Sequence, residues 1–516
     1  MSTFYLTTAI DYANGDPHIG HAYEKIGADA IARYKRLCGD DVRFLIGMDE
    51  HGQKVAQAAE ERGVTPQQQV DEIAVRFEKM WKRLEISNDT FMRTTSDAHK
   101  AGVRALIKRV FETSPDDFYE KSYAGWYCVG CEAFKQDSEI ADGKCVLHPT
   151  RKLEWVEERN WFFRLSKYQG FLKRLISERP GFLQPESRRN EMLALLEQGL
   201  EDVSASRARF SWGIPFPAPL SNGETQTTYV WFEALPNYLT ATGFPAKGYK
   251  DKWPAQLHIV GKDINRFHTI IWPAILQAAE LPLPERVWVH GFVLFGGERF
   301  SKSAGVKLDL WEAIERFGPD AFRYFLLREV PFDTDGTFSW ERFEQVYTSE
   351  LANTWGNLVS RTVAMMEKYF DGVVPAAQQT DLDTVDAKDI EAYHAAMDGR
   401  NGFLLHEGIR RALACVTRGN EYVQTQQPWA LAKSPEKRGA LETTMGALAR
   451  ALARQAVLLF PFVPSKARDV WAQLGAPGRI DDQRFDSLTK LDATGWRVRK
   501  GDPLFPKPAT ASSPEA

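Results

Sequence analysis

The sequence lacks any apolar stretch of the roughly 20 residues that a membrane-spanning helix needs. Its mean hydropathy is -0.38 and 26% of its residues are charged, as in a chain that folds in water. The N-terminus, MSTFYLTTAI, has neither the basic segment and apolar core of a signal peptide nor the Arg-rich pattern of a transit peptide. We therefore expect a cytoplasmic protein that makes no membrane contact.

The sequence also has few cysteines and a small net charge. Five cysteines in 516 residues exclude a disulfide framework in a reducing compartment. A net charge of -4 gives no sign of a nucleic-acid binder, although a large enzyme can hold a local basic path on an acidic body. Repeats are absent, and only the last 16 residues, rich in Pro, Ala and Ser, are expected to form a mobile tail. The length predicts two to four domains.

Strand and helix patterns alternate over the first 60 residues. Residues 4–10 are typical of a strand, residues 19–37 have helical spacing that ends at Gly39, and residues 42–48 are typical of a second strand. This order predicts a βαβ unit that opens a parallel sheet, as in nucleotide-binding α/β domains.

Further along the chain the pattern changes twice. Residues 114–226 break the rhythm and are expected to form an insertion with its own small fold. The α/β pattern returns at residues 227–232, 256–261 and 286–293. After residue 341 almost every periodic segment is helical, namely 343–369, 387–427, 437–460 and 464–474.

Two histidines, His18 and His21, stand three residues apart where the first helix begins, and so share one face. The free amides of a helix N-terminus favour an anion, and two imidazoles there can donate to phosphate oxygens. The spacing fits equally well one surface histidine and one histidine that caps the helix. On this motif alone, both interpretations stay open.

A second candidate for phosphate chemistry is the segment GGERFSKSAGVKL, with Lys302 between two serines and flanking glycines. Such a loop can bend over a triphosphate and place an ammonium group on it. Taken alone, the segment fits a solvated surface loop better.

Three of the five cysteines lie between positions 128 and 145, in the pattern Cys128-x2-Cys131-x13-Cys145-x2-His148. Two paired ends of this kind have the spacing of zinc ligands, and four protein ligands indicate a closed, structural site. The alternative is a chance grouping of three cysteines. Cys38 and Cys415 are expected to be plain thiols.

Together, the HIGH motif at 18–21 and the SKS motif at 301–303 resemble the paired signatures of class I aminoacyl-tRNA synthetases. Within that class the chain is similar to the methionyl-tRNA synthetase family, with which it shares TTAIDYANGDPHIGHAYE, GMDEHGQK, YVWFEALPNY and GKDINRFHTIIWPA in the same order. The resemblance extends to about residue 507 and includes the form with a single zinc knuckle.

The resemblance implies an α/β fold: a Rossmann-type parallel-sheet catalytic domain with a zinc-containing insertion, followed by an all-α anticodon-binding bundle. We expect the catalytic domain at 1–113 and 227–295, the insertion at 114–226, the SKS loop and stem-contact region at 296–345, the bundle at 346–490 and a tail at 491–516. Because longer relatives append a dimerising domain that this sequence lacks, a monomer is expected, and no protein partner is evident.

The family's reaction implies that methionine attacks ATP to form methionyl-adenylate, and that the terminal adenosine of tRNA then takes the methionyl group. The implied catalytic residues are His18, His21 and Lys302, and Mg²⁺ accompanies ATP. The implied ATP-binding residues are Gly20, Asp263, Arg299, Ser301 and Ser303. Arg299-Phe300 departs from the Lys-Met that the family often has there, which makes the role of Arg299 secondary.

The resemblance also implies a methionine pocket in which Asp49 pairs with the ammonium group beside the backbone of Ile10. The thioether would be lined by Tyr12, Trp231, Ala234, Leu235, Tyr238, Ile264 and His268. Aromatic rings do suit a polarizable sulfur, although packing in the core is the usual role of such aromatics.

In the helical region, Asn357 and Arg361 stand one helical turn apart, and Trp429 follows Pro428 at a helix start. By resemblance they read the CAU anticodon of tRNA(Met), including the initiator tRNA, with Trp429 as a stacking surface. Taken singly, each of these residues fits a structural role better.

Two alternatives deserve comparison. The valyl, isoleucyl and leucyl enzymes carry a much larger editing insertion than residues 114–226 allow, and the cysteinyl enzyme holds zinc in its catalytic pocket. A non-catalytic RNA-binding relative or a zinc-stabilised scaffold would not need His18, His21, Lys302 and Asp49 together.

Overall fold

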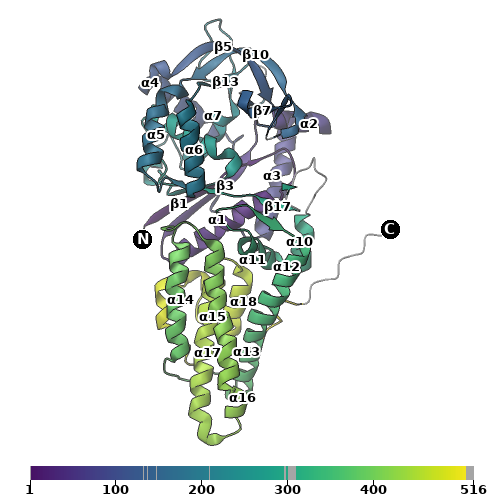
Figure 1. Ribbon diagram of the computed structural model, residues 1–516, viewed down its shortest axis with the longest axis vertical. Helices are drawn as coiled ribbons and strands as arrows, with labels where there is room; N and C mark the ends of the chain where they lie inside the picture. Colours follow the sequence, from purple (N-terminus) through teal and green to yellow (C-terminus); the bar gives the residue numbers. More distant parts are fainter. Residues whose placement is uncertain are drawn as a thin grey trace, which may run out of the picture.

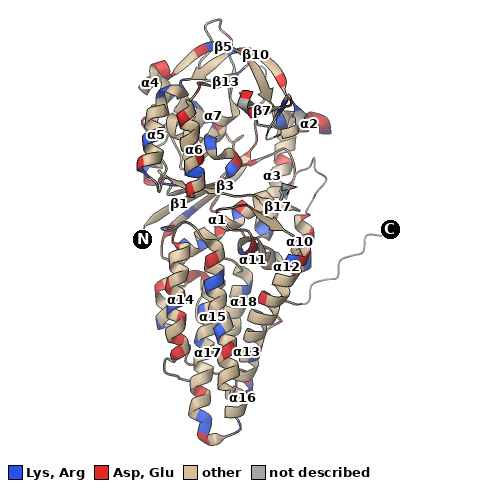
Figure 2. Cartoon of the chain, viewed as in Figure 1, with Lys and Arg blue, Asp and Glu red and all other residues tan. Residues whose placement is uncertain are grey.

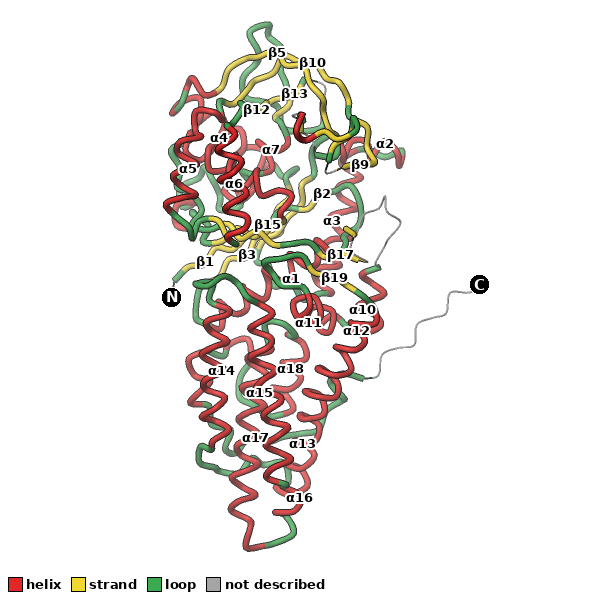
Figure 3. The backbone as a smooth tube through the Cα atoms, viewed as in Figure 1, coloured by secondary structure: helices red, strands yellow, loops and turns green. Residues whose placement is uncertain are grey.

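The computed structural model describes residues 2–506 except 132, 136, 147, 209, 296, 297 and 300–308. The chain forms an upper body, built around a parallel sheet and its insertion, and a lower body of long helices (Figure 1). In Figure 3 the strands gather in the upper body while the lower body is almost wholly helical.

The central sheet has seven strands in the order β11-β16-β15-β1-β3-β2, with β4 also paired to β3. All of these pairings are parallel. The strands are β1 (Thr3–Thr8), β2 (Asp11–Tyr12), β3 (Asp41–Asp49), β4 (Thr90–Arg93), β11 (Leu183–Gln184), β15 (Leu257–Gly261) and β16 (Val287–His290). Helix α1 (Ile19–Leu37) connects β1 to its parallel neighbour β3, which confirms the predicted βαβ unit.

Other helices of the upper body lie around the central sheet, and some of them lie between the sheet and the helical bundle (Figure 1). They are α2 (Gln53–Arg62), α3 (Pro66–Arg83), α4 (Asp97–Thr113), α7 (Val230–Ala234), α8 (Asn237–Thr240), α9 (Trp272–Ala278), α10 (Leu310–Phe317) and α11 (Pro319–Glu329). A small sheet of β17 (Val293–Phe295), β18 (Glu298–Arg299) and β19 (Gly336–Phe338) adjoins α10 and α11. Because β1, β3, β15 and β16 are parallel, their carboxyl ends meet at one edge of the sheet, the usual place for a ligand.

The strand predicted at residues 227–232 is wrong for most of its length. Only Thr227–Thr228 form a strand, β14, which pairs with β13 (Ser206–Arg207) outside the central sheet. The following residues form the short helix α7. A brief apolar run fits a buried helix as well as a buried strand, and its periodicity cannot separate the two.

The insertion is mainly antiparallel. Strands β5 (Phe118–Cys128), β6 (Ala133–Phe134), β10 (Glu154–Phe163) and β12 (Val203–Ser204) form one sheet, and β7 (Ile140–Ala141), β8 (Lys144–Cys145) and β9 (His148–Lys152) form another. Helices α5 (Gln169–Glu178) and α6 (Glu186–Gln198) follow. Between them, β11 returns to the edge of the central sheet, a pairing that the sequence pattern did not indicate.

The lower body contains α12 (Trp340–Val346), the π-helix η7 (Tyr347–Gly356), α13 (Asn357–Phe370), α14 (Asp381–Met397), α15 (Leu405–Gln426), α16 (Pro428–Leu431), α17 (Arg438–Leu459) and α18 (Pro464–Gln473). The single helix predicted over 387–427 is wrong. It is interrupted between α14 and α15, where Gly399 and Gly402 have φ of 83° and 94°, values that residues with a Cβ rarely adopt.

A fully buried arginine joins the two bodies. Arg323 of α11 donates from Nη2 to Asp29 Oδ2 on α1, at 2.6 Å. Its guanidinium also donates to the carbonyl oxygens of Leu84, at 3.0 Å, and of Pro461 and Phe462 in the turn before α18, at 2.9 and 3.1 Å. Although burial opposes the charge, Arg33 and Arg323 hold the pKa of the Asp29 carboxyl well below its usual range.

The mobile tail predicted over the last 16 residues is wrong for its beginning. Leu504 and Phe505 are buried, and the Phe505 ring lies 5.9 Å from Tyr347 and 6.0 Å from Trp355. Two adjacent apolar residues gain enough by burial to fix this segment, despite the prolines around them. The rest of the predicted tail, 507–516, lies outside the described residues.

Acidic and basic residues are interspersed along the ribbons of both bodies (Figure 2). This distribution agrees with the small net charge of -4. Among the described segments, every helix is too short or too polar to cross a lipid bilayer.

Candidate active site

The two histidines of the HIGH motif build the N-terminus of α1. His18 is the N-cap residue and its Nδ1 accepts the N–H of Gly20 at 3.1 Å. His21 Nδ1 in turn accepts the N–H of His18 at 3.3 Å, and the two rings stack with centroids 3.6 Å apart. Since Nδ1 of each ring is an acceptor, each neutral ring carries its hydrogen on Nε2. Both histidines therefore cap the helix and keep an N–H donor on the far side of the ring.

Below these rings lies a buried cluster of charges that sequence reasoning missed. The fully buried Lys25 Nζ donates to Asp11 Oδ1 at 2.7 Å, to Glu24 Oε1 at 2.9 Å and to the carbonyl of Ala9 at 2.8 Å. His290 Nε2 lies 3.0 Å from Glu24 Oε2. Burial raises the pKa of Asp11 to about 7, against the lowering effect of Lys25. The cluster ties the start of α1 to the carboxyl ends of β1 and β16.

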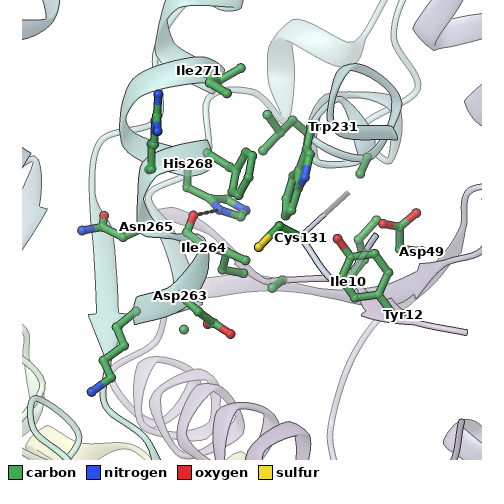
Figure 4. A pocket seen from close by; sticks show the side chains of 18 of the residues that line it. Ile10, Tyr12, Asp49, Cys131, Trp231, Asp263, Ile264, Asn265, His268 and Ile271 are labelled. Atoms are coloured by element: carbon green, nitrogen blue, oxygen red, sulfur yellow. Dashed lines mark hydrogen bonds between the residues drawn. The ribbon is translucent and has the colours of Figure 1, made fainter. Parts of the chain in front are cut away.

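The apolar end of the site lies beside Asp49, at the end of β3 (Figure 4). Asp49 is buried, and the Tyr12 and Trp231 rings meet edge to face, with centroids 6.4 Å apart. The Trp231 indole stacks on Phe267 at 3.6 Å, and Lys54 Nζ lies 4.0 Å from the centre of the Tyr12 ring. Sequence reasoning missed Phe267 and Lys54, because neither stands in a recognisable spacing with its partner.

A series of hydrogen bonds crosses this apolar end. The Tyr238 hydroxyl lies 2.6 Å from His268 Nε2, and His268 Nδ1 lies 3.0 Å from the carbonyl oxygen of Ile264 (Figure 4). Burial lowers the pKa of His268 to about 4, so the ring is neutral at pH 7. The carbonyl can only accept, so His268 donates from Nδ1, and its Nε2 accepts from Tyr238. The series fixes both side chains in one orientation.

These residues surround a single cavity of about 1490 Å³. The predicted site residues that line it are Ile10, Tyr12, His18, Gly20, His21, Asp49, Trp231, Ala234, Leu235, Tyr238, Asp263, Ile264 and His268. Residues of the insertion close the cavity from above, including Cys131 and His148. Arg299 lies in strand β18, and Ser301, Lys302 and Ser303 lie outside the described residues.

The predicted metal ligands Cys128, Cys131, Cys145 and His148 come together, with their ligand atoms all within 4.8 Å of one another. Cys131 Sγ lies 3.6 Å from Cys145 Sγ and 3.3 Å from His148 Nδ1, and Cys128 Sγ lies 3.7 Å from His148 Nδ1. Tetrahedral zinc, with bonds of about 2.3 Å to sulfur and 2.0–2.1 Å to nitrogen, would space its ligand atoms about 3.6–3.8 Å apart. The four residues thus fit a metal of this size.

The three residues predicted to read an anticodon lie on the lower body. Asn357 begins α13 and is exposed, Arg361 lies one turn further and is partly exposed, and the Trp429 ring on α16 is 38% exposed. Helices α13 and α16 both pack against α17. All three side chains are therefore accessible, and helices α13 and α16, which carry them, lie in the lower body (Figure 1).

Comparison with known proteins adds two family matches. Residues 4–152 and 138–363 match the family described as "tRNA synthetases class I (M)". Residues 371–512 match the family described as "Anticodon binding domain of methionyl tRNA ligase".

Several relatives resemble the chain over nearly its whole length. It is 43% identical to a methionine--tRNA ligase of Caldanaerobacter subterraneus, over 98% of this chain and 79% of the relative. It is 41% identical to a methionine--tRNA ligase of Bacillus subtilis, over 98% of this chain and 78% of that relative. A solved Mycobacterium tuberculosis methionyl-tRNA synthetase in complex with methionyl-adenylate superposes with a TM-score of 0.92 at 38% identity, over 98% of this chain and 100% of that chain.

Proposed function

Because this chain belongs to the methionyl-tRNA synthetases of class I, we infer that it activates L-methionine with ATP and attaches it to tRNA(Met). The two family matches support this function, and so do the relatives named above, which align with 98% of the chain. The observation that carries it is the cavity of about 1490 Å³, which the HIGH motif at the start of α1 lines together with Asp49 and Trp231.

For the activation step, we propose that the methionine carboxylate attacks the α-phosphate of ATP and that pyrophosphate leaves. His18 and His21 donate from Nε2 to phosphate oxygens that gain charge in the transition state. The positive end of the α1 helix dipole, whose first turn contains no acidic residue, favours the same charge. Mg²⁺ accompanying the ATP would neutralise part of the phosphate charge.

The other proposed contacts surround that reaction. Lys302 is the third catalytic group, and the ATP-binding residues are Gly20, Asp263, Arg299, Ser301 and Ser303. Asp49 pairs with the methionine ammonium group beside Ile10. The thioether lies among Tyr12, Trp231, Ala234, Leu235, Tyr238, Ile264 and His268, where the series of hydrogen bonds from Tyr238 to Ile264 holds two of the walls.

In the second step, the 2′-hydroxyl of the terminal adenosine attacks the carbonyl carbon of methionyl-adenylate, and AMP leaves. The substrates are elongator and initiator tRNA(Met), and the reaction takes place in the cytoplasm. We assign catalysis to 1–113 and 227–295, the zinc knuckle to 114–226, stem contacts to 296–345 and anticodon binding to 346–490. Residues 491–516 form the C-terminal segment.

ATP–pyrophosphate exchange with each standard amino acid tests this function. We expect methionine to support exchange far better than any other amino acid. Exchange with a different amino acid would reassign the enzyme within its class, and no exchange with any of them would refute the catalytic function.

The metal that best fits the Cys128–His148 cluster is one structural Zn²⁺ per chain. A site with four protein ligands has no open position for chemistry, so its contribution is to the fold of the knuckle. This part of the insertion lines the cavity through Cys131 and His148, so zinc would also shape its upper wall.

We expect Cys145→Ser to lower the zinc content well below one per chain, because serine is a poor zinc ligand. The melting temperature should fall by at least about 2–4 °C, the shift that 1 kcal/mol of lost stability produces in a domain of 150–250 residues. Metal analysis and thermal unfolding measure both effects. Cys38→Ser, a change at an exposed cysteine outside the cluster, is the control and should change neither. An unchanged metal ratio in Cys145→Ser would refute the zinc assignment.

We propose that Asn357, Arg361 and Trp429 bind the anticodon, Trp429 as a stacking surface and the other two through base edges. Loss of one stacked base costs about 1–3 kcal/mol. Trp429→Ala should therefore lower kcat/KM for tRNA charging roughly 5- to 150-fold.

Methionine-dependent pyrophosphate exchange should be unchanged in Trp429→Ala, because the ring lies far from the cavity. Trp155→Ala is a matched control, since Trp155 is also exposed (57%) but lies on the insertion. Equal losses of charging and exchange in Trp429→Ala would count against an anticodon role.

A further inference from the structure

A buried histidine–carboxylate pair lies directly behind the methionine pocket. His51 Nδ1 is 2.5 Å from Glu233 Oε1, and their side chains are only 2% and 1% exposed. Neither residue lines the large cavity, so neither is placed to touch the substrates. Their contribution must therefore act through the residues beside them.

Those neighbours form two opposite parts of the pocket. His51 follows Asp49 by two residues in the loop after β3, and Glu233 stands between Trp231 and Ala234 on α7. The pair thus joins the loop that carries the ammonium-binding carboxylate to the helix that carries the thioether-binding ring.

Further contacts hold Glu233 in place. Its Oε2 accepts the N–H of Ile214 at 3.1 Å, and its carbonyl oxygen lies 3.0 Å from His99 Nε2. Burial lowers the pKa of His99 to about 3, so that ring is neutral and donates one hydrogen, from Nε2, to this carbonyl. Helix α7 is only five residues long, and this side chain and this carbonyl anchor it to the rest of the domain.

His51, on the loop after β3, is also held in place by its neighbours. The His51 ring packs against Trp212 with centroids 5.2 Å apart, and Trp212 Nε1 donates to the carbonyl of Glu50 at 2.7 Å. A buried polar pair of this kind contributes little net stability, because the loss of hydration offsets the attraction. In some proteins such buried pairs set a unique conformation, a role that this pair's position between two parts of the pocket suits.

We propose that His51 and Glu233 are a positioning pair, which sets the distance between Asp49 and Trp231 and thereby the affinity of the pocket for methionine. The inference rests on the proposed function, because it concerns the same pocket. It makes neither residue catalytic.

Steady-state pyrophosphate exchange on the full chain tests the proposal with Glu233→Ala and the nearly isosteric Glu233→Gln. Since a misplacement of about 1 Å can cost roughly 100-fold, we expect KM for methionine to rise about 10- to 100-fold in Glu233→Ala. KM for ATP should stay within about twofold, because its site lies on the other side of the cavity. Glu233→Gln keeps an acceptor for the Ile214 N–H, so it should recover part of the methionine affinity.

Asp386→Asn is the matched control for loss of a buried ion pair. Asp386 is fully buried and lies 3.0 Å from Arg454 Nη2 in the helical bundle, away from the pocket. We expect it to lower the melting temperature without changing KM for methionine. The proposal is overturned if the Glu233 variants behave in the same way, or if their KM values for methionine and ATP rise equally.

A double-mutant cycle adds a second criterion. If the two side chains act as a unit, the KM for methionine of His51→Ala/Glu233→Ala should be no higher than that of the worse single variant. Independent, additive effects would refute the pair. A wild-type chain without methionine-dependent exchange would instead refute the proposed function itself, so the two failures are distinguishable.

Discussion

Replacement of His21 by Gln, or of His18 by Asn, should lower the rate of methionine-dependent pyrophosphate exchange roughly 100- to 1000-fold. Loss of one preorganised donor to a developing oxyanion typically has this effect, about 3–4 kcal/mol. KM for methionine should change little, because Asp49 and the aromatic pocket are untouched. Exchange kinetics at saturating ATP measure both quantities.

These two substitutions are chosen because they preserve the helix cap. Asn is among the best N-cap residues, and Gln at the third helical position completes a capping box as His21 does here. The variants should therefore melt close to wild type, whereas His18→Ala should lose about 1 kcal/mol of stability in addition to its rate. If the alanine variants lose stability but keep the wild-type exchange rate, the histidines act only as caps.

Replacement of Asp49 by Asn should raise KM for methionine roughly 30-fold or more. The change leaves a hydrogen-bonding group of the same size but removes the charge that we propose for binding the substrate ammonium group. Removal of one partner from a buried charge pair costs about 2–5 kcal/mol, where each 1.4 kcal/mol is a factor of ten. Pyrophosphate exchange over a wide range of methionine concentrations measures the effect.

Asp41→Asn is the control for this prediction. Asp41 begins the same strand, β3, but is exposed at its opposite end. The KM of the Asp41→Asn variant for methionine should equal that of wild type. An Asp49→Asn variant that binds methionine normally would show that the ammonium group is held elsewhere.

Local patterns in the sequence predicted the parts of the fold that depend on neighbouring residues. The strand-helix-strand unit could be predicted because β1, α1 and β3 each have their own periodicity. Residues such as Gly39 also mark where an element ends. The spacing of Cys128, Cys131, Cys145 and His148 predicted a metal site, and the structure brings their four ligand atoms together. The parallel sheet then placed Asp49 at the edge where the HIGH motif lies.

Contacts between distant segments could not be predicted in this way. Glu24 and Lys25 lie within a helical pattern where charges usually indicate a solvated face, yet both are buried against Asp11 and His290. The stack of Trp231 on Phe267 depends on α7 being a helix, which a short apolar run does not reveal. In each case the partner's identity is set by the tertiary fold.

The buried guanidinium of Arg323 has a consequence for how the molecule unfolds. Its partners are Asp29 and Leu84 in the sheet body, and Pro461 and Phe462 in the helical body. Detachment of the helical body would remove two of its acceptors, the carbonyls of Pro461 and Phe462, and would expose apolar residues of the core that both bodies share. The two bodies should therefore melt as one cooperative unit, with a single endotherm in calorimetry. Arg323→Met should split that endotherm into two.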